Sequence, residues 1–299
     1  MTAPAKNGEL PSRSRRAVWG SRAWRWTRLP LFSYVGVVVL MALLEERLVF
    51  GPQRHPNGFW RPAGLDFEDV DFEAADGVKL HGWYVPHPNP RAYVLFAHGN
   101  GGNVTYWAEE YATLHKLGVA VFAFDYRGYG RSLGVPNEAG VLTDARAARA
   151  WLAKRAGIDQ KDVVVMGLSL GGGVAVDLAA ADGARGLVLL NTFNSLPDAA
   201  AVHYPWVPVR WLMRSRFDSA AKIARYHGPL LQTHGDRDDI VPLALGKQLF
   251  AAANEPKRFV LVPRGGHNDP LTPAFVTALD EFLEHLPPMS QGSSAQAAP

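Results

Sequence analysis

The stretch around Ser169 constrains the fold more than any other part of this sequence. Val163–Val165 is a short β-branched run that predicts a buried strand, and the motif Gly167–Gly171 follows it directly. A Gly-x-Ser-x-Gly between a strand and a helix is the setting of a nucleophile elbow, which holds a serine hydroxyl above the end of a sheet. By itself the motif also fits an ordinary glycine-rich turn, so the other requirements of a reactive serine must come from elsewhere in the chain.

Runs of strand length alternate with stretches of helical length through most of the chain. The first two expected strands, 69–73 and 80–84, form a hairpin around Asp76-Gly77. The later alternation is typical of parallel strands joined by crossover helices. We therefore predict an α/β domain over residues 69–286, with a mostly parallel eight-stranded sheet and helices on both faces. The later strands are expected at 93–96, 119–124, 162–167, 186–191, 229–233 and 258–262, and the helices at 104–117, 138–156, 170–182, 242–254 and 272–286.

A reactive serine needs a base to accept its proton and a third group to orient that base. After an elbow of this kind, the acid and then the histidine are expected at the ends of later strands. His267 follows two glycines after the strand at 258–262, which makes it the predicted base. The acid comes from the loop after the strand at 229–233, which contains Asp236, Asp238 and Asp239.

Negative charge that develops on a substrate oxygen needs backbone N–H donors opposite the elbow. The loop 98–103 follows the strand at 93–96, where such donors belong, and its glycines expose N–H groups. We predict that the N–H groups of Asn100 and Leu170 form this oxyanion hole. His98 is expected to be structural, pairing with the backbone beneath the loop.

The segment Asp125–Pro136, Asp-Tyr-Arg-Gly-Tyr-Gly-Arg-Ser-Leu-Gly-Val-Pro, resembles the loop after strand four of α/β-hydrolases. It is most similar to the branch that contains protein depalmitoylases, monoacylglycerol and lysophospholipid lipases, and their membrane-anchored bacterial relatives. His-Gly-Asn, Gly-Leu-Ser-Leu-Gly-Gly, His-Gly-x-x-Asp and Gly-His-Asn-Asp match that branch in order and spacing over about residues 60–286. The resemblance implies the α/β-hydrolase fold and assigns the acid to Asp238. The turn Asn100–Asn103 is richer in glycine than the branch's pattern, which leaves Asn100 or Gly101 as the donor.

An insertion at 192–219 separates the strand at 186–191 from the strand that precedes the acidic loop. Such enzymes carry a cap at this position, so we expect a short cap here. Trp206 and Trp211 lie within it and are candidate substrate-binding residues that line an acyl pocket. The alternative is that both rings fill the small core of the cap itself.

The basic charge of the chain is concentrated at its N-terminus. Residues 1–28 contain seven Lys or Arg against one Glu, whereas the whole chain has a net charge of +3, so the remainder is net negative. The net charge of the domain therefore does not indicate nucleic-acid binding. The sequence has no cysteine, which excludes disulfides, thiolate metal sites and cysteine nucleophiles.

Residues 29–44 form an uncharged apolar run that would be about 24 Å long as a helix. Signal-peptide cleavage requires small residues in an A-x-A-like pattern, which Ala42–Glu45 does not offer, and a buried soluble helix would show polar residues on one face. We predict a transmembrane signal anchor over residues 29–50, with a cytoplasmic N-terminus and the hydrolase domain on the far, extracytoplasmic side. A linker over 51–68 follows, and residues 1–28 and 287–299 are expected to be disordered.

These features together predict a membrane-anchored serine hydrolase. Ser169, Asp238 and His267 would cleave a carboxylic ester or thioester of a small-molecule or lipid acyl group through an acyl-enzyme, with no cofactor and no metal. One alternative is a serine peptidase of the prolyl-oligopeptidase type, although the chain has no large gating domain. The other is a catalytically silent membrane scaffold.

Overall fold

The computed structural model describes residues 15–269 and 271–290 of the 299-residue chain. The chain divides into two compact units, Met1–Glu45 and Glu46–Pro299. The second unit holds all the predicted site residues and is built on one sheet. In the described residues this sheet has eight strands: β1 (Glu68–Glu73), β2 (Lys79–Val85), β3 (Ala92–Ala97), β4 (Val119–Asp125), β5 (Val164–Leu168), β6 (Gly186–Leu190), β7 (Leu230–Gly235) and β8 (Lys257–Val262).

The strands lie in the order β1-β2-β4-β3-β5-β6-β7-β8. β1 and β2 pair antiparallel, β2 pairs antiparallel with β4, and every later pairing is parallel. All residues of β4, β5, β6 and β7 are buried, which is typical of central strands covered on both faces. The edge strand β8 is only partly buried. The predicted mostly parallel α/β sheet is confirmed.

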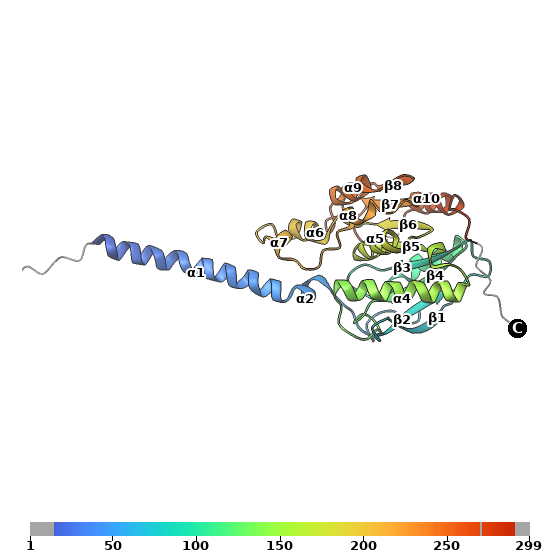
Figure 1. The fold of residues 1–299 in the computed structure, drawn as a ribbon, viewed down its shortest axis with the longest axis horizontal. Helices are drawn as coiled ribbons and strands as arrows, with labels where there is room; N and C mark the ends of the chain where they lie inside the picture. Colours follow the sequence, from blue (N-terminus) through green and yellow to red (C-terminus); the bar gives the residue numbers. More distant parts are fainter. Residues whose placement is uncertain (1–14, 270, 291–299) are drawn as a thin grey trace, which may run out of the picture. The chain divides into compact units, whose positions relative to one another are not determined.

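Helices pack on both faces of the sheet (Figure 1). One apolar core joins the sheet to α4 (Glu138–Ala156), α5 (Leu170–Asp182), α8 (Ser219–Ile223) and α9 (Leu243–Ala252), and the other joins it to α3 (Ala108–Lys116) and α10 (Pro273–Glu284). The remaining short helices of this unit are η1 (Val104–Trp107), η2 (Gln160–Asp162), α6 (Leu196–His203) and α7 (Val209–Leu212). Burying each large apolar side chain in these cores contributes about 1.5–3 kcal/mol, which is the main source of stability for the layers.

Local sequence signals set the helix ends. The side chain of Asn137 accepts a hydrogen bond from the N–H of Gly140 at 2.8 Å, which caps the start of α4. The helix ends at Gly157, whose φ of 68° lies in the left-handed region that suits glycine. α4 therefore begins and ends within a residue or two of the predicted 138–156.

The prediction of a transmembrane helix over residues 29–50 is wrong. The first unit contains α1 (Arg15–Leu43), and α2 (Glu45–Val49) begins at its last residue. Nowhere in residues 15–269 and 271–290 is there a helix with the length and apolar character needed to cross a membrane. The uncharged run of 29–44 measures only about 24 Å, short of the roughly 30 Å of a hydrocarbon core, and α1 reaches back from it into an arginine-rich sequence.

The predicted single-pass localisation, with a cytoplasmic N-terminus and an extracytoplasmic domain, fails with the anchor. α1 begins at Arg15, inside the segment for which disorder is predicted. The remaining predictions of terminal disorder, over 1–14 and 291–299, lie outside the described residues.

Candidate active site

Ser169 occupies a strained turn between β5 and α5. Its φ of 52° and ψ of −116° are unusual for a residue with a side chain. A Cβ at Gly167 would collide with the carbonyl of Gly171, and a Cβ at Gly171 would collide with the carbonyl oxygens of Ala97 and His98. The two glycines of the motif are therefore required by the close approach of backbones, and they let the turn lift Ser169 above the sheet.

The serine hydroxyl meets a histidine from the loop after β8. The Oγ of Ser169 lies 3.0 Å from Nε2 of His267, and Nδ1 of the same ring lies 2.7 Å from Oδ2 of Asp238. With the ring proton on Nδ1 and donated to the carboxylate, Nε2 is free to accept a hydrogen bond from the serine O–H. All three side chains are buried, with 9%, 8% and 7% of Ser169, His267 and Asp238 exposed.

The carboxylate of Asp238 is held in its charged form. Burial by itself would raise the pKa of Asp238. Hydrogen bonds from His234, from His267 and from the N–H of Val241 outweigh burial, and they hold this pKa well below its usual range. The N–H groups of Ile240 and Val241 both donate to Oδ1, at 3.0 and 2.7 Å. The charged carboxylate beside Nδ1 keeps the imidazole oriented.

The other acids of the same loop have different surroundings. Asp236 is exposed, and its Oδ1 accepts a hydrogen bond from the N–H of Arg264 at 2.6 Å. Asp239 is also exposed. Of the three candidate acids, the structure brings Asp238 to His267.

The residues predicted as oxyanion donors lie in two segments next to the serine, the start of α5 and the loop 98–103. Leu170 is the first residue of α5, where backbone N–H groups have no partner within the helix. Asn100 belongs to the loop 98–103, and a Cβ added at the neighbouring Gly99 would lie 3.5 Å from Cβ of Ser169. The loop therefore passes directly beside the serine.

His98 is buried beneath this loop and pairs with backbone. Its Nδ1 donates to the carbonyl of Gly99 at 2.8 Å, and its own carbonyl accepts from the Tyr126 hydroxyl at 2.7 Å. Burial lowers the pKa of His98, although the nearby Asp125 carboxylate acts in the opposite direction. A neutral, buried ring at this position supports the loop.

The side chain of Asn100 is clamped by three groups. Its Oδ1 accepts hydrogen bonds from the N–H of Gly51 at 2.8 Å and from the hydroxyl of Tyr129 at 2.7 Å. Its Nδ2 donates to the carbonyl of Val49 at 2.6 Å. Such a clamp fixes the direction of the Asn100 backbone, which is what an oxyanion donor requires.

The segment 49–57, which we name the strap, supports the same loop along its length. Pro52 bridges to Gly102, and the carbonyl of Gln53 accepts a hydrogen bond from the Asn103 side chain at 3.2 Å. The Asn57 carbonyl accepts from the same amide group at 2.8 Å. Most of the strap lies in the predicted linker, so sequence reasoning missed its role. No periodic pattern marked it, because it pairs through its own backbone groups, chiefly with the side chains of Asn100 and Asn103 about 50 residues away.

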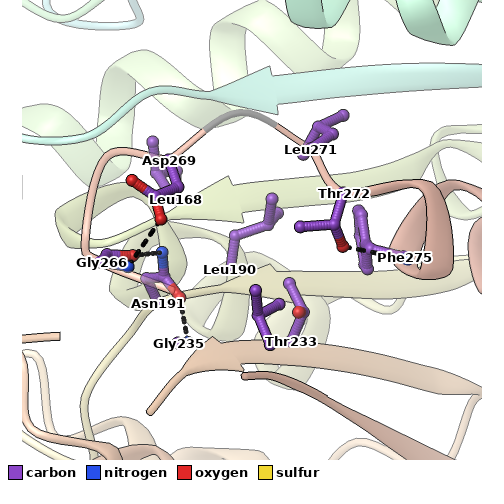
Figure 2. A pocket seen from close by; sticks show the side chains of 11 residues that line it. Leu168, Leu190, Asn191, Thr233, Gly235, Gly266, Asp269, Leu271, Thr272 and Phe275 are labelled. Atoms are coloured by element: carbon purple, nitrogen blue, oxygen red, sulfur yellow. Dashed lines mark hydrogen bonds between the residues drawn. The ribbon is translucent and has the colours of Figure 1, made fainter. Parts of the chain in front are cut away.

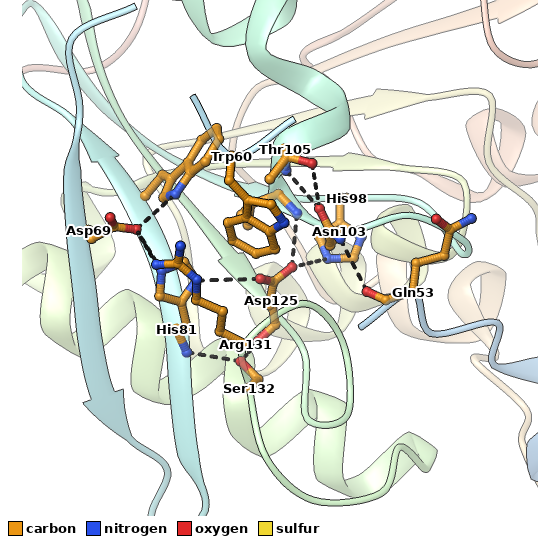
Figure 3. Close-up of polar contacts among 12 residues, drawn as sticks. Gln53, Trp60, Asp69, His81, His98, Asn103, Thr105, Asp125, Arg131 and Ser132 are labelled. Carbon is orange, nitrogen blue, oxygen red and sulfur yellow. Dashed lines mark hydrogen bonds and ion pairs between the residues drawn. The ribbon is translucent and has the colours of Figure 1, made fainter. Parts of the chain in front are cut away.

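Asp125 at the end of β4 supports the far end of the loop (Figure 3). Its Oδ1 accepts a hydrogen bond from the N–H of Val104 at 2.8 Å and lies 3.7 Å from Nε2 of His98. Its Oδ2 lies 3.5 Å from Nδ1 of His81. A Cβ at Gly130 would collide with this carboxylate. The motif that begins at Asp125 therefore buries a carboxylate that organises the loop beside Ser169.

Asn191, directly after β6, ties the loops of the acid and the histidine together (Figure 2). Its Oδ1 accepts from the N–H of Gly235 at 3.1 Å, and its Nδ2 donates to the carbonyl of His267 at 2.7 Å. Its φ of 44° is one that asparagine tolerates better than most residues. The only sequence signal was a lone asparagine at a strand end, which was not enough to single it out.

The insertion 192–219 contains α6 and α7, and α8 begins at its last residue. Trp211 in α7 is 90% exposed and Trp206 is 51% exposed. Trp211 therefore does not fill a core of the insertion in this structure. The role of both rings in binding substrate stays a prediction.

Clusters of His, Asp and Glu side chains are common ligands of metal ions in proteins. Among the side chains that the structure describes, no three of these types cluster in an arrangement suited to a metal.

The chain is similar to known proteins over most of its length. The family described as Hydrolase_4, serine aminopeptidase S33, matches residues 88–222, a span that includes Ser169 but neither Asp238 nor His267. The chain is 43% identical over 240 residues to the uncharacterized protein Rv2307c of Mycobacterium tuberculosis, covering 79% of this chain and 84% of that one. It is 34% identical over 271 residues to the α/β-hydrolase domain-containing protein WAV2 of Arabidopsis thaliana, covering 80% and 87%.

Solved structures share the fold. An esterase from Pyrococcus furiosus superimposes with a TM-score of 0.65 at 22% identity, covering 79% of this chain and 99% of that one. The acetyl xylan esterase from Paenibacillus sp. R4 gives a TM-score of 0.62 at 23% identity, covering 77% and 87%. At these identities the likeness concerns the fold alone.

The charged state of Asp238 predicts a pH-dependent contribution to stability. Because the folded-state pKa lies below the unfolded value of about 3.9, the stabilisation is present above pH 4 and is lost as the pH falls further. At pH 7, Asp238→Asn should lower the free energy of unfolding by about 1–3 kcal/mol in urea titrations. The difference in the free energy of unfolding between the variant and the wild type should become smaller below pH 4. A difference that stays constant from pH 7 to pH 3 would contradict this account.

The clamp on Asn100 predicts a kinetic effect of Tyr129→Phe. The variant keeps the buried ring and removes one hydrogen bond to Oδ1 of Asn100. We expect kcat to fall about three- to tenfold, the equivalent of one hydrogen bond, with KM and the melting temperature little changed. Steady-state kinetics and thermal unfolding check this. A large loss of thermal stability with unchanged kcat would show that Tyr129 acts on folding alone.

Proposed function

Because the chain belongs to the α/β-hydrolase family, we propose that it is a serine hydrolase that cleaves carboxylic esters or thioesters. The observation that carries this proposal is the line of hydrogen bonds from Ser169 through His267 to Asp238, buried at the ends of three strands. The esterases among the structures of the same fold support an ester as the substrate. The substrate is a small-molecule or lipid-like acyl ester.

In the first half of the proposed reaction, His267 acts as the general base. Its Nε2 accepts the hydroxyl proton as Oγ of Ser169 attacks the acyl carbon. The N–H groups of Asn100 and Leu170 stabilise the negative charge that forms on the carbonyl oxygen. The Asp238 carboxylate stabilises the imidazolium through Nδ1–H. The tetrahedral intermediate then collapses as Nε2–H gives its proton to the leaving oxygen or sulfur.

The second half releases the acyl group. Water gives a proton to Nε2 of His267 and attacks the acyl-enzyme carbonyl, which is again stabilised by the two backbone N–H groups. Collapse of the second intermediate returns the proton to Oγ of Ser169 and frees a carboxylic acid. The charges of the three residues are the same before and after the cycle.

The proposed roles predict a steep loss of activity in Ser169→Ala. With the nucleophile removed, kcat should fall about 10⁴- to 10⁶-fold on p-nitrophenyl acetate. Asp238→Asn should cost up to about 10⁴-fold because the imidazole loses its orienting partner. Asp236→Asn is the matched control, an exposed acid two residues away, and should keep activity within about threefold. Near-normal turnover by Ser169→Ala, or a larger loss in Asp236→Asn than in Asp238→Asn, would overturn the assignment.

A serine peptidase is the second candidate, favoured by the description of the matching family. Ester and amide substrates with the same acyl group separate the two. For each substrate, the rate acceleration is kcat/KM divided by the rate constant of uncatalysed hydrolysis. We expect this acceleration to be at least about 10³-fold larger for an aminoacyl p-nitrophenyl ester than for the matching p-nitroanilide. Equal accelerations for the ester and the anilide would favour the peptidase.

A further inference from the structure

A groove of about 880 Å³ lies beside the candidate active site, between residues 53–65 and the segment 100–112. This volume is within the range of 300–1,000 Å³ that is typical of small-molecule sites. Most of its lining is apolar. The apolar side chains that define it are Phe59, Pro62, Leu65, Tyr106, Trp107 and Ala112.

Ser169, Asp238 and His267 do not line the groove themselves, but residues next to the reacting groups line it at two points. One wall includes Asn100, whose neighbour Gly99 passes beside Ser169. The other point is Asn268, the residue after His267. A substrate carbonyl between the loop 98–103 and the histidine would therefore have the mouth of the groove next to it.

The two walls of the groove are held together by hydrogen bonds. The N–H of Phe59 donates to Oγ1 of Thr105 at 2.9 Å, and the Asn103 side chain donates to the carbonyl of Asn57 at 2.8 Å. The rings of Phe59 and Tyr106 pack edge to face with their centroids 6.0 Å apart. The groove is thus formed before any substrate arrives, which reduces the entropy lost on binding.

We propose that this groove binds the acyl chain of the substrate, a proposal that rests on the proposed ester hydrolysis. The leaving group must lie near His267, which protonates it, and among the described residues of that loop Asn268 alone lines the groove. The loop 98–103, which holds the carbonyl oxygen, contributes Asn100, Gly101 and Gly102. The acyl side of the scissile bond therefore faces the apolar walls.

Charged residues at the groove narrow the class of acyl chain. Glu109, Glu110 and Arg61 also line it. Two carboxylates against one guanidinium disfavour a negative charge on the acyl chain. The groove therefore suits an uncharged hydrocarbon chain, not the half-ester of a dicarboxylic acid.

The test uses the full-length protein and p-nitrophenyl esters from acetate to dodecanoate, at concentrations below micelle formation. In the wild type, kcat/KM should rise with chain length by up to about fourfold per methylene, the value for taking one methylene from water, until the groove is full. Ala112→Phe, in the middle of α3, should fill the groove. We expect it to lower kcat/KM for octanoate at least tenfold and to leave acetate within twofold. Ala251→Phe, at an exposed position of α9 and away from the groove, is the matched control.

Phe59→Ala provides a second variant, because Phe59 is 70% exposed and its loss should not disturb folding. It should lower kcat/KM for octanoate about threefold or more while acetate is unchanged. In a second series the acyl group stays acetate and the alcohol is lengthened, and Ala112→Phe should leave kcat/KM for these esters unchanged. If Ala112→Phe lowers kcat/KM in the alcohol series and not in the acyl series, or in neither series, the groove does not bind the acyl chain.

Acetate hydrolysis keeps the two proposals apart. A wild type that cleaves acetate while Ala112→Phe and Phe59→Ala leave the chain-length profile unchanged overturns the groove and leaves the proposed function standing. A wild type that cleaves no ester overturns the proposed function, and the acyl-chain site with it.

Discussion

The positive φ of Ser169 is the constraint on which the rest of the site depends. A residue held in such a conformation costs about 1–3 kcal/mol, and the cost must be offset by surrounding structure. β5, buried along its whole length, and α5, packed against it, supply that structure. Only glycine fits at Gly167 and Gly171, because backbone carbonyls occupy the space of a Cβ. The strain places one hydroxyl where strand ends from three parts of the chain converge.

The partners of Ser169 depend in turn on residues that take no part in the proposed chemistry. Asn191 connects the end of β7 to the histidine loop. The strap pairs with Asn100, Gly102 and Asn103 of the loop 98–103, and Asp125 binds the N–H of Val104, which follows the loop. Most of these contacts join a side chain to backbone, so they fix main-chain directions as well as side-chain positions. This matters because the groups proposed to stabilise developing charge are backbone N–H donors, whose aim depends on the loop.

The sequence was informative where a pattern repeats or an order is enforced. Alternation of polar and apolar residues predicted β1 and β2, apolar runs predicted the later strands, and strand order placed His267 and the acidic loop at one edge of the sheet. Prediction from the sequence failed where the position of a segment depends on contacts with a distant part of the chain. The strap is irregular and rich in Pro and Gly, and its value lies in bonds to a loop about 50 residues away. The anchor prediction fails because the run 29–44, although uncharged, is short of the length that a helix needs to span a hydrocarbon core.

The central claim is that Ser169 is the nucleophile, and chemical labelling tests it most directly. The full-length protein would be treated with a fluorophosphonate, which forms a stable adduct with an activated serine, and digested for peptide mass spectrometry. The account predicts one stoichiometric adduct on the peptide that contains Ser169, formed far more slowly in Asp238→Asn. Labelling of a different serine, or none under conditions where an ester is hydrolysed, would contradict it.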